Sequence, residues 1–156
     1  AFDKSGFDQV EFLLAPNLGE GLKPLVKVAS GGETSRMMLA LKNILARADE
    51  VPTLIFDEID QGIGGRIGMV VGEKLWQLGR QHQVFCVTHL PQLAAFGDQH
   101  LKVEKLLEEG RTLTRVAPLE KDARLLELAQ MLGDVGEGTL RSAHEILQAA
   151  QDIRKK

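Results

Sequence analysis

The chain has 156 residues, 44% hydrophobic and 26% charged, which suits one domain with a buried core and excludes a disordered tail. Its 19 basic and 22 acidic residues give a net charge of −3, which argues against a strongly basic nucleic-acid clamp. A single cysteine excludes a disulfide framework within the chain, and no apolar stretch is long enough to span a bilayer, so we expect no membrane partner.

The first third of the sequence predicts two extended segments and then a helix. Apolar residues at every second position predict a strand over 9–14, and an extended pattern resumes over 22–28 after a glycine-containing turn. An apolar stripe predicts a helix over 31–48. Ser30 directly precedes this helix and Glu33 follows three residues later, which is the spacing of a capping box.

The middle of the chain alternates apolar strands with helices. A fully buried strand is predicted over 53–56, a helix over 66–80, a second buried strand over 84–88 and a short helix over 91–96. Strands of this kind, separated by helices, favour a parallel sheet with helices packed on it.

The last third predicts a β-hairpin and two closing helices. The hairpin strands are expected over 101–106 and 111–116, and the helices over 120–132 and 138–153. The complete pattern predicts an α/β fold with a mainly parallel sheet, flanking helices and a hairpin near the carboxy-terminal end.

The start of the helix at residue 31 is a candidate anion site. Gly31 and Gly32 leave the backbone N–H groups unobstructed, the helix dipole adds positive charge, and the Ser30 hydroxyl can donate to a phosphate oxygen. The alternative is a plain capping box after a loop.

Polar residues after the two apolar strands form a second candidate group. Asp57 is a candidate Mg²⁺ ligand, and Glu58 a candidate base for an attacking water; alternatively, both acids simply face solvent at the strand end. His89 can donate to a transferring phosphate or be a structural histidine, and Asp60 can be a turn residue. No Gly-x-x-x-x-Gly-Lys-Ser/Thr occurs in the chain, so a phosphate cradle must come from elsewhere.

Four motifs of ABC-type ATPases have a resemblance here, in their usual order. Residues 30–33 resemble the signature, 54–58 resemble Walker B, Asp60 resembles the D-loop residue and His89 resembles the H-loop residue. The resemblance is greater to SMC-like members that repair DNA, although Ala29 stands where most ABC signatures carry leucine. It implies that residues 1–156 are one C-terminal half-head, the C-terminal lobe of an ABC/SMC-type P-loop ATPase head, with the Walker A half in another segment.

The resemblance implies a role for each matching residue. Asp57 is expected to hold Mg²⁺, Glu58 to act as the catalytic base, His89 to sense the γ-phosphate, and Asp60 to couple the two sites of a dimer. The residues expected at the ATP held by the opposite subunit, or near the dimer seam, are Ser30, Gly31, Gly32, Glu33 and Arg36.

The implied partners are ATP, Mg²⁺, an N-terminal half-head carrying Walker A, and a second head joined through sandwiched ATP. The resemblance implies a cytoplasmic, nucleoid-associated protein that acts in recombinational repair of double-strand breaks. The full-length protein would bind DNA. The chain itself is expected to be a piece of that protein and to be inactive alone. Two alternatives remain: part of an ABC transporter's nucleotide-binding domain, and a non-enzymatic interaction module.

Overall fold

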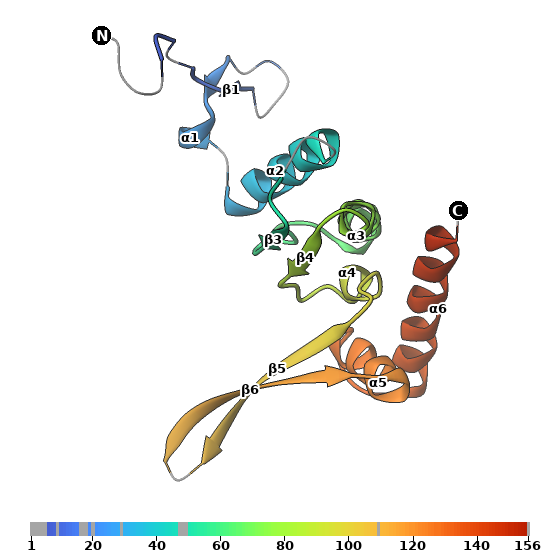
Figure 1. The fold of residues 1–156 in the computed structure, drawn as a ribbon. Coiled ribbons are helices and arrows are strands. Elements are labelled where there is room, and N and C mark those ends of the chain that lie inside the picture. The colour runs from blue at the N-terminus through green and yellow to red at the C-terminus, as the bar shows by residue number, and fades with distance from the viewer. Residues whose placement is uncertain are drawn as a thin grey trace.

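A computed structural model of the chain describes residues 6–8, 10–15, 19, 21–28, 30–46, 50–108 and 110–155. Gln9, Ala29 and the predicted helix end over 47–48 lie outside these ranges. The elements of the chain, arranged as Figure 1 shows, are β1 (Leu13–Leu14), β2 (Lys23–Pro24), α1 (Leu25–Val28), α2 (Gly31–Leu45), β3 (Thr53–Phe56), α3 (Gly65–Gly79), β4 (Gln83–Cys86), α4 (Pro91–Ala94), β5 (His100–Glu108), β6 (Arg111–Leu119), α5 (Lys121–Met131) and α6 (Glu137–Arg154).

The amino-terminal segment differs from the extended pattern predicted over 22–28. Pro24 ends β2 and the chain turns directly into α1, whose first residue, Leu25, donates its backbone N–H to the carbonyl of Phe12 at 2.8 Å. A proline has no N–H with which to continue a strand ladder, so a change of conformation at this point is physically reasonable.

A parallel pair of strands lies at the centre of the chain. β3 and β4 pair with Leu54 opposite Val84 and Phe56 opposite Cys86, and α3 makes the connection between them. The predicted strand–helix–strand unit is therefore confirmed, and in the described ranges its sheet consists of these two strands. The polar residues that follow both strands consequently lie at one edge.

The core fills one side of this strand pair. Leu54 and Phe56 of β3 point toward the helices and are 9% and 5% exposed. Residues that pack with them come from both neighbouring helices and from the loop after β3, among them Leu39, Ile59, Val71, Leu75 and Leu78. Burying each such side chain stabilises the fold by about 1.5–3 kcal/mol, so this cluster fixes the loop after β3 firmly to the helices.

The other side of the strand pair is open. Ile55 is 72% exposed, and Phe85 and Val87 are 43% and 60% exposed, so the prediction of two fully buried strands is wrong for alternate positions. The physical reason is that, in the described ranges, the helices pack on one face of the pair. Apolar residues also remain exposed on the predicted stripes of α2 and α3, including Met38, Leu41, Ile44, Leu45, Ile67 and Val70.

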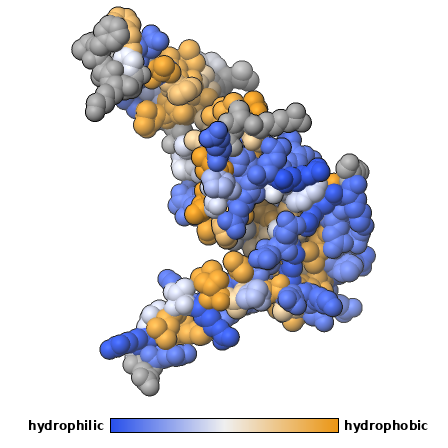
Figure 2. Space-filling model, viewed as in Figure 1, coloured by the Kyte–Doolittle hydropathy of each residue, from blue (hydrophilic) through white to orange (hydrophobic). Residues whose placement is uncertain are grey.

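The carboxy-terminal third holds the predicted hairpin and helices. β5 and β6 pair antiparallel over nine residues each, longer than predicted, and the ribbon extends away from the helices (Figure 1). Apolar side chains gather on the visible surface of this ribbon and over the amino-terminal segment (Figure 2). α5 and α6 pack together through Leu128, Ala129 and Ala143, each 0% exposed.

Candidate functional site

The start of α2 has the capping box that the sequence predicts. The Ser30 hydroxyl oxygen accepts the backbone N–H of Glu33 at 3.3 Å, and the Glu33 carboxylate accepts the backbone N–H of Ser30 at 2.9 Å. The backbone N–H and the hydroxyl of Ser30 both stabilise the ionised Glu33 carboxylate and hold its pKa below its usual range. The Ser30 hydroxyl thus interacts with Glu33, and it would have to turn away from that carboxylate to donate to a phosphate oxygen.

The loop after β3 presents Glu58 in an unusual conformation. Its φ of 57° lies in the left-handed region, which is rare outside glycine and common at functional sites. The backbone N–H of Glu58 donates to the Asp57 carboxylate at 2.9 Å, and its carbonyl accepts the N–H of Gln61 at 3.0 Å. A Cβ on Gly31 would lie 2.6 Å from the Glu58 carboxylate, so this acid approaches the start of α2 closely.

Side chains of α2 bind the backbone of this loop. The Ser35 hydroxyl donates to the carbonyl of Asp57 at 3.0 Å. The Arg36 guanidinium donates from one nitrogen to the carbonyls of Ile59, at 3.0 Å, and Gln61, at 2.9 Å. The sequence predicts that Arg36 lies near the nucleotide or the dimer seam; its described hydrogen bonds are to the loop.

Gly32 allows α2 and the loop to approach each other. Its N–H donates to the Gln61 side-chain oxygen at 3.4 Å, and a Cβ there would lie 2.9 Å from both the Gln61 carbonyl and the Arg36 guanidinium. The candidate-residue set drawn from the sequence misses Ser35 and Gln61. Gln61 lies beside Asp60 in the loop and Ser35 one turn after Gly31, so position is the signal that could have found them.

Asp60 joins the two polar strand ends through a buried carboxylate. It is 3% exposed, and one of its oxygens accepts the Thr88 hydroxyl at 2.5 Å and the His89 backbone N–H at 2.8 Å. The His89 Nδ1 lies 3.0 Å from the same oxygen. Burial on its own raises the pKa of Asp60, but these hydrogen bonds outweigh it and the pKa lies below its usual value.

The predicted site residues therefore gather on one side of the chain. The start of α2 contacts the loop after β3, and that loop contacts Thr88 and His89 after β4. The His89 side chain remains 73% exposed, and Asp57 and Glu58 are exposed as well. The arrangement offers two carboxylates and an imidazole to a ligand approaching from solvent, whereas the N–H groups of Gly32 and Glu33 already donate within the chain.

The donor set fits magnesium only in part. Among the residues that the structure describes, no three His, Cys, Asp or Glu side chains converge on one point. Mg²⁺ in phosphate-transfer sites commonly takes one or two carboxylates, with phosphate oxygens and water as its other ligands. The exposed Asp57 carboxylate fits one such position; the other ligands would come from a nucleotide, water or another segment.

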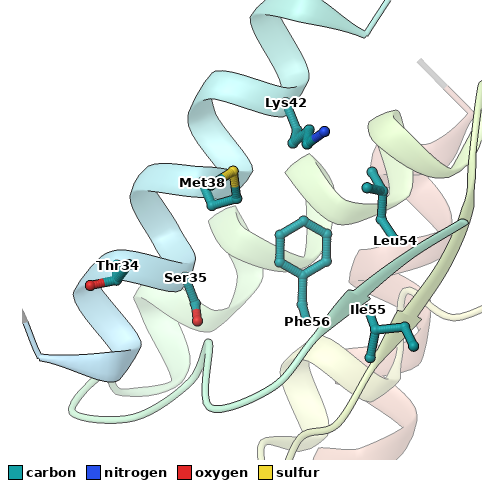
Figure 3. Close-up of a pocket in the computed structure, with 7 residues that line it drawn as sticks. All are labelled: Thr34, Ser35, Met38, Lys42, Leu54, Ile55 and Phe56. Atoms are coloured by element: carbon teal, nitrogen blue, oxygen red, sulfur yellow. The ribbon is translucent and has the colours of Figure 1, made fainter. Parts of the chain in front are cut away.

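A small groove lies beside the site, between α2 and β3 (Figure 3). Its volume is about 260 Å³, below the range of about 300–1,000 Å³ usual for small-molecule pockets. The residues that line it are Thr34, Ser35, Met38, Lys42, Leu54, Ile55 and Phe56. Its size and apolar floor suit a few side chains of a packing segment better than a whole nucleotide.

The chain is similar to curated proteins along nearly its whole length. It is 49% identical to the DNA repair protein RecN of Vibrio cholerae over 147 residues, which cover 93% of the chain and 26% of that relative. It is 45% identical to RecN of Bacillus subtilis over 153 residues, covering 97% of the chain and 27% of the relative. The chain thus spans about a quarter of the length of the curated relatives it matches. No protein-family model matches it.

A solved structure shares the fold. It comes from work on ATP-driven dimerization and DNA-stimulated activation of SMC ATPases, and it superposes with a TM-score of 0.52 over 76% of this chain and 70% of its own. The sequences are 20% identical, so this likeness concerns the fold alone. The α/β fold predicted from the sequence is confirmed by this likeness.

Proposed function

Because this chain is a RecN-like segment with the fold of an SMC ATPase head, we propose that it is the carboxy-terminal half-head of an ATPase that acts in recombinational repair of DNA double-strand breaks. The observation that carries the proposal is the contact of three polar segments, the start of α2, the loop 57–61 and the turn 88–89. The relatives are named DNA repair proteins, which supports the repair part of the proposal.

The proposed chemistry is phosphoryl transfer from ATP to water, in which positioning and electrostatic stabilisation supply most of the rate. Glu58 orients and deprotonates the attacking water, and His89 donates to the γ-phosphate. Asp57 would hold Mg²⁺, which neutralises charge on the phosphates when bound. The exposure of all three side chains supports these roles.

The proposed binding of ATP needs two further segments. An amino-terminal half-head would bring the Walker A cradle, for which the chain has no motif. A second head would close over the nucleotide with Ser30, Gly31, Gly32 and Glu33, in line with the ATP-driven dimerization of the SMC neighbour. DNA would be bound by the full-length protein, in the cytoplasm at the nucleoid.

The alternatives receive less support. An ABC transporter domain would also carry a signature and Walker B, but the similar proteins are repair proteins and an SMC ATPase. No helix in the described ranges is long and apolar enough to cross a membrane. A non-enzymatic interaction module would share the fold, and only a measurement of turnover separates it from the proposal.

The test is ATP hydrolysis by the completed head. The chain is co-expressed with the amino-terminal segment of its full-length protein, and Mg²⁺-dependent phosphate release is measured. Glu58→Gln should reduce kcat by at least about 100-fold, since general-base catalysis contributes about 10²–10⁴, while ATP-bound dimers persist on size exclusion.

Glu108→Gln is the matched control, since Glu108 is an exposed acid at the end of β5, in the hairpin. It should hydrolyse ATP at the wild-type rate. Wild-type turnover by Glu58→Gln would remove Glu58 from the mechanism. A completed wild-type head that neither hydrolyses ATP nor dimerises with it would favour the interaction module.

A further inference from the structure

Two hydrogen bonds hold the peptide unit between Asp57 and Glu58. Its carbonyl, from Asp57, accepts the Ser35 hydroxyl at 3.0 Å, and its N–H, from Glu58, donates to the Asp57 carboxylate at 2.9 Å. The next peptide unit is held as well, because the Glu58 carbonyl accepts the Gln61 N–H at 3.0 Å. The planar peptide units on its two sides set the backbone angles of Glu58, so these three bonds together hold its left-handed φ of 57°.

Ser35 is the one of these partners that belongs to another element. It is half-buried on α2, and Figure 3 shows its side chain pointing from that helix toward the end of β3 at Phe56. A serine or threonine inside a helix often donates to the carbonyl four residues back, as Thr34 does to Ser30 at 3.0 Å. The Ser35 hydroxyl donates across to the loop, so α2 fixes the peptide unit that precedes Glu58.

The same face of α2 also meets the side chain of Glu58. Gly31 lies four residues before Ser35, which places the two residues on one face of the helix. A Cβ on Gly31 would lie 2.6 Å from a Glu58 carboxylate oxygen. This face therefore meets Glu58 at two points, with Ser35 at its backbone and Gly31 beside its carboxylate.

We infer that Ser35 is a positioning residue for Glu58: its hydroxyl holds the backbone conformation that directs the Glu58 side chain. A general base must lie within about 2.6–3.2 Å of the group whose proton it takes, so a modest rotation of this backbone would carry the carboxylate out of reach. That Glu58 is a base rests on the proposed function. The hydrogen bond of Ser35, and the conformation that it holds, do not.

The hold on the backbone can be measured without nucleotide, by hydrogen exchange of the Glu58 amide in the completed head. Alanine is the better helix former, so α2 stays intact in Ser35→Ala. This variant should exchange about fivefold faster, the factor that one lost hydrogen bond represents. Ser35→Thr keeps the hydroxyl and should exchange at the wild-type rate. Unchanged exchange in Ser35→Ala would overturn the inference.

In turnover by the completed head, Ser35→Ala should lower kcat about tenfold, since a misplacement of about 1 Å can cost about 100-fold, while KM for ATP changes less. Ser35→Thr should keep kcat near the wild-type value. Asn43→Ala is the matched control, because the Asn43 side chain donates at 2.9 Å to the Leu39 carbonyl of the same helix. It should leave both kcat and the exchange of the Glu58 amide unchanged. A wild-type kcat in Ser35→Ala would contradict the inference.

A double variant separates action through Glu58 from a general effect on the fold. In the Glu58→Gln background, adding Ser35→Ala should lower kcat no further, because the group that Ser35 positions is already gone. A further drop, by the same factor as in the wild-type background, would show that Ser35 acts elsewhere. A completed wild-type head without ATPase activity would instead sink the proposed function and leave the amide exchange as the test of Ser35.

Discussion

The guanidinium of Arg36 joins α2 to the loop that carries Glu58. Both of its hydrogen bonds are accepted by backbone carbonyls of the loop, so they can form only while the loop keeps its turn. Arg36→Met keeps most of the side-chain length but removes both bonds, each worth about 0.5–1.5 kcal/mol. The amides of Gln61 and Ile63, bonded within the loop, should then exchange with solvent about tenfold faster, as measured by hydrogen exchange.

Arg141→Met is the matched control, since Arg141 pairs with Glu145 on the exposed surface of α6. It should leave exchange in the loop unchanged. Equal exchange rates in wild type, Arg36→Met and Arg141→Met would show that the loop holds its shape without Arg36.

For single residues, spacing in the sequence identifies side chains whose own functional groups could bind a ligand or transfer a proton. Asp57 and Glu58 follow one apolar strand and His89 follows the next, and the structure brings these two segments together. A side chain that donates to backbone carbonyls leaves no such pattern, because every residue has a carbonyl. The hydrogen bonds of Arg36 to the loop could therefore not be predicted from the sequence. Asp60 was expected at a dimer seam; its side chain is buried and accepts two hydrogen bonds from Thr88 and His89, in a turn 28 residues away.

At the scale of elements, α3 packs against the segment after α4 through a glycine. A Cβ on Gly72 would lie 2.4 Å from the ring of Phe96, which is 3% exposed and has no room to move. Alanine gains about 1 kcal/mol of helix propensity over glycine, but overpacking a core costs about 1–3 kcal/mol. Gly72→Ala should therefore lower the free energy of unfolding by about 1 kcal/mol, measured by urea denaturation.

Gly79 offers the comparison within the same helix. It is the last residue of α3, and nothing lies within 4 Å of the position where its Cβ would stand. Gly79→Ala should raise the free energy of unfolding by up to about 1 kcal/mol. If both variants are stabilised, the contact between α3 and Phe96 is looser than the structure has it.

The order and type of the central elements follow from periodicity, but their burial does not. The run 53–56 is apolar at three of its four positions, which is typical of a strand covered on both faces. In the chain, Leu54 and Phe56 are covered while Ile55 is open. A sequence pattern indicates that a face is apolar, without saying which polypeptide covers it.

At the scale of the whole molecule, one face of β3 and β4 leaves apolar side chains uncovered. Ile55 is exposed at its centre, and the groove in Figure 3 runs beside it. The hairpin also exposes apolar residues, among them Val103 and Leu107, but it extends away from the helices (Figure 1), whereas β3 leads directly into the loop that carries Asp57 and Glu58. The amino-terminal half-head is therefore expected to pack on β3 and leave the tip of the hairpin free.

Two lysine substitutions at similarly exposed residues test this expectation. Ile55 and Leu107 are 72% and 77% exposed, so Ile55→Lys and Leu107→Lys should each change the stability of the chain by no more than about 0.5 kcal/mol. In the interface, an unpaired lysine at residue 55 would cost several kcal/mol, and every 1.4 kcal/mol is a tenfold loss of affinity. Calorimetric titration with the amino-terminal half should thus show at least about 100-fold weaker binding for Ile55→Lys and wild-type binding for Leu107→Lys. The reverse pattern would place the missing half on the hairpin.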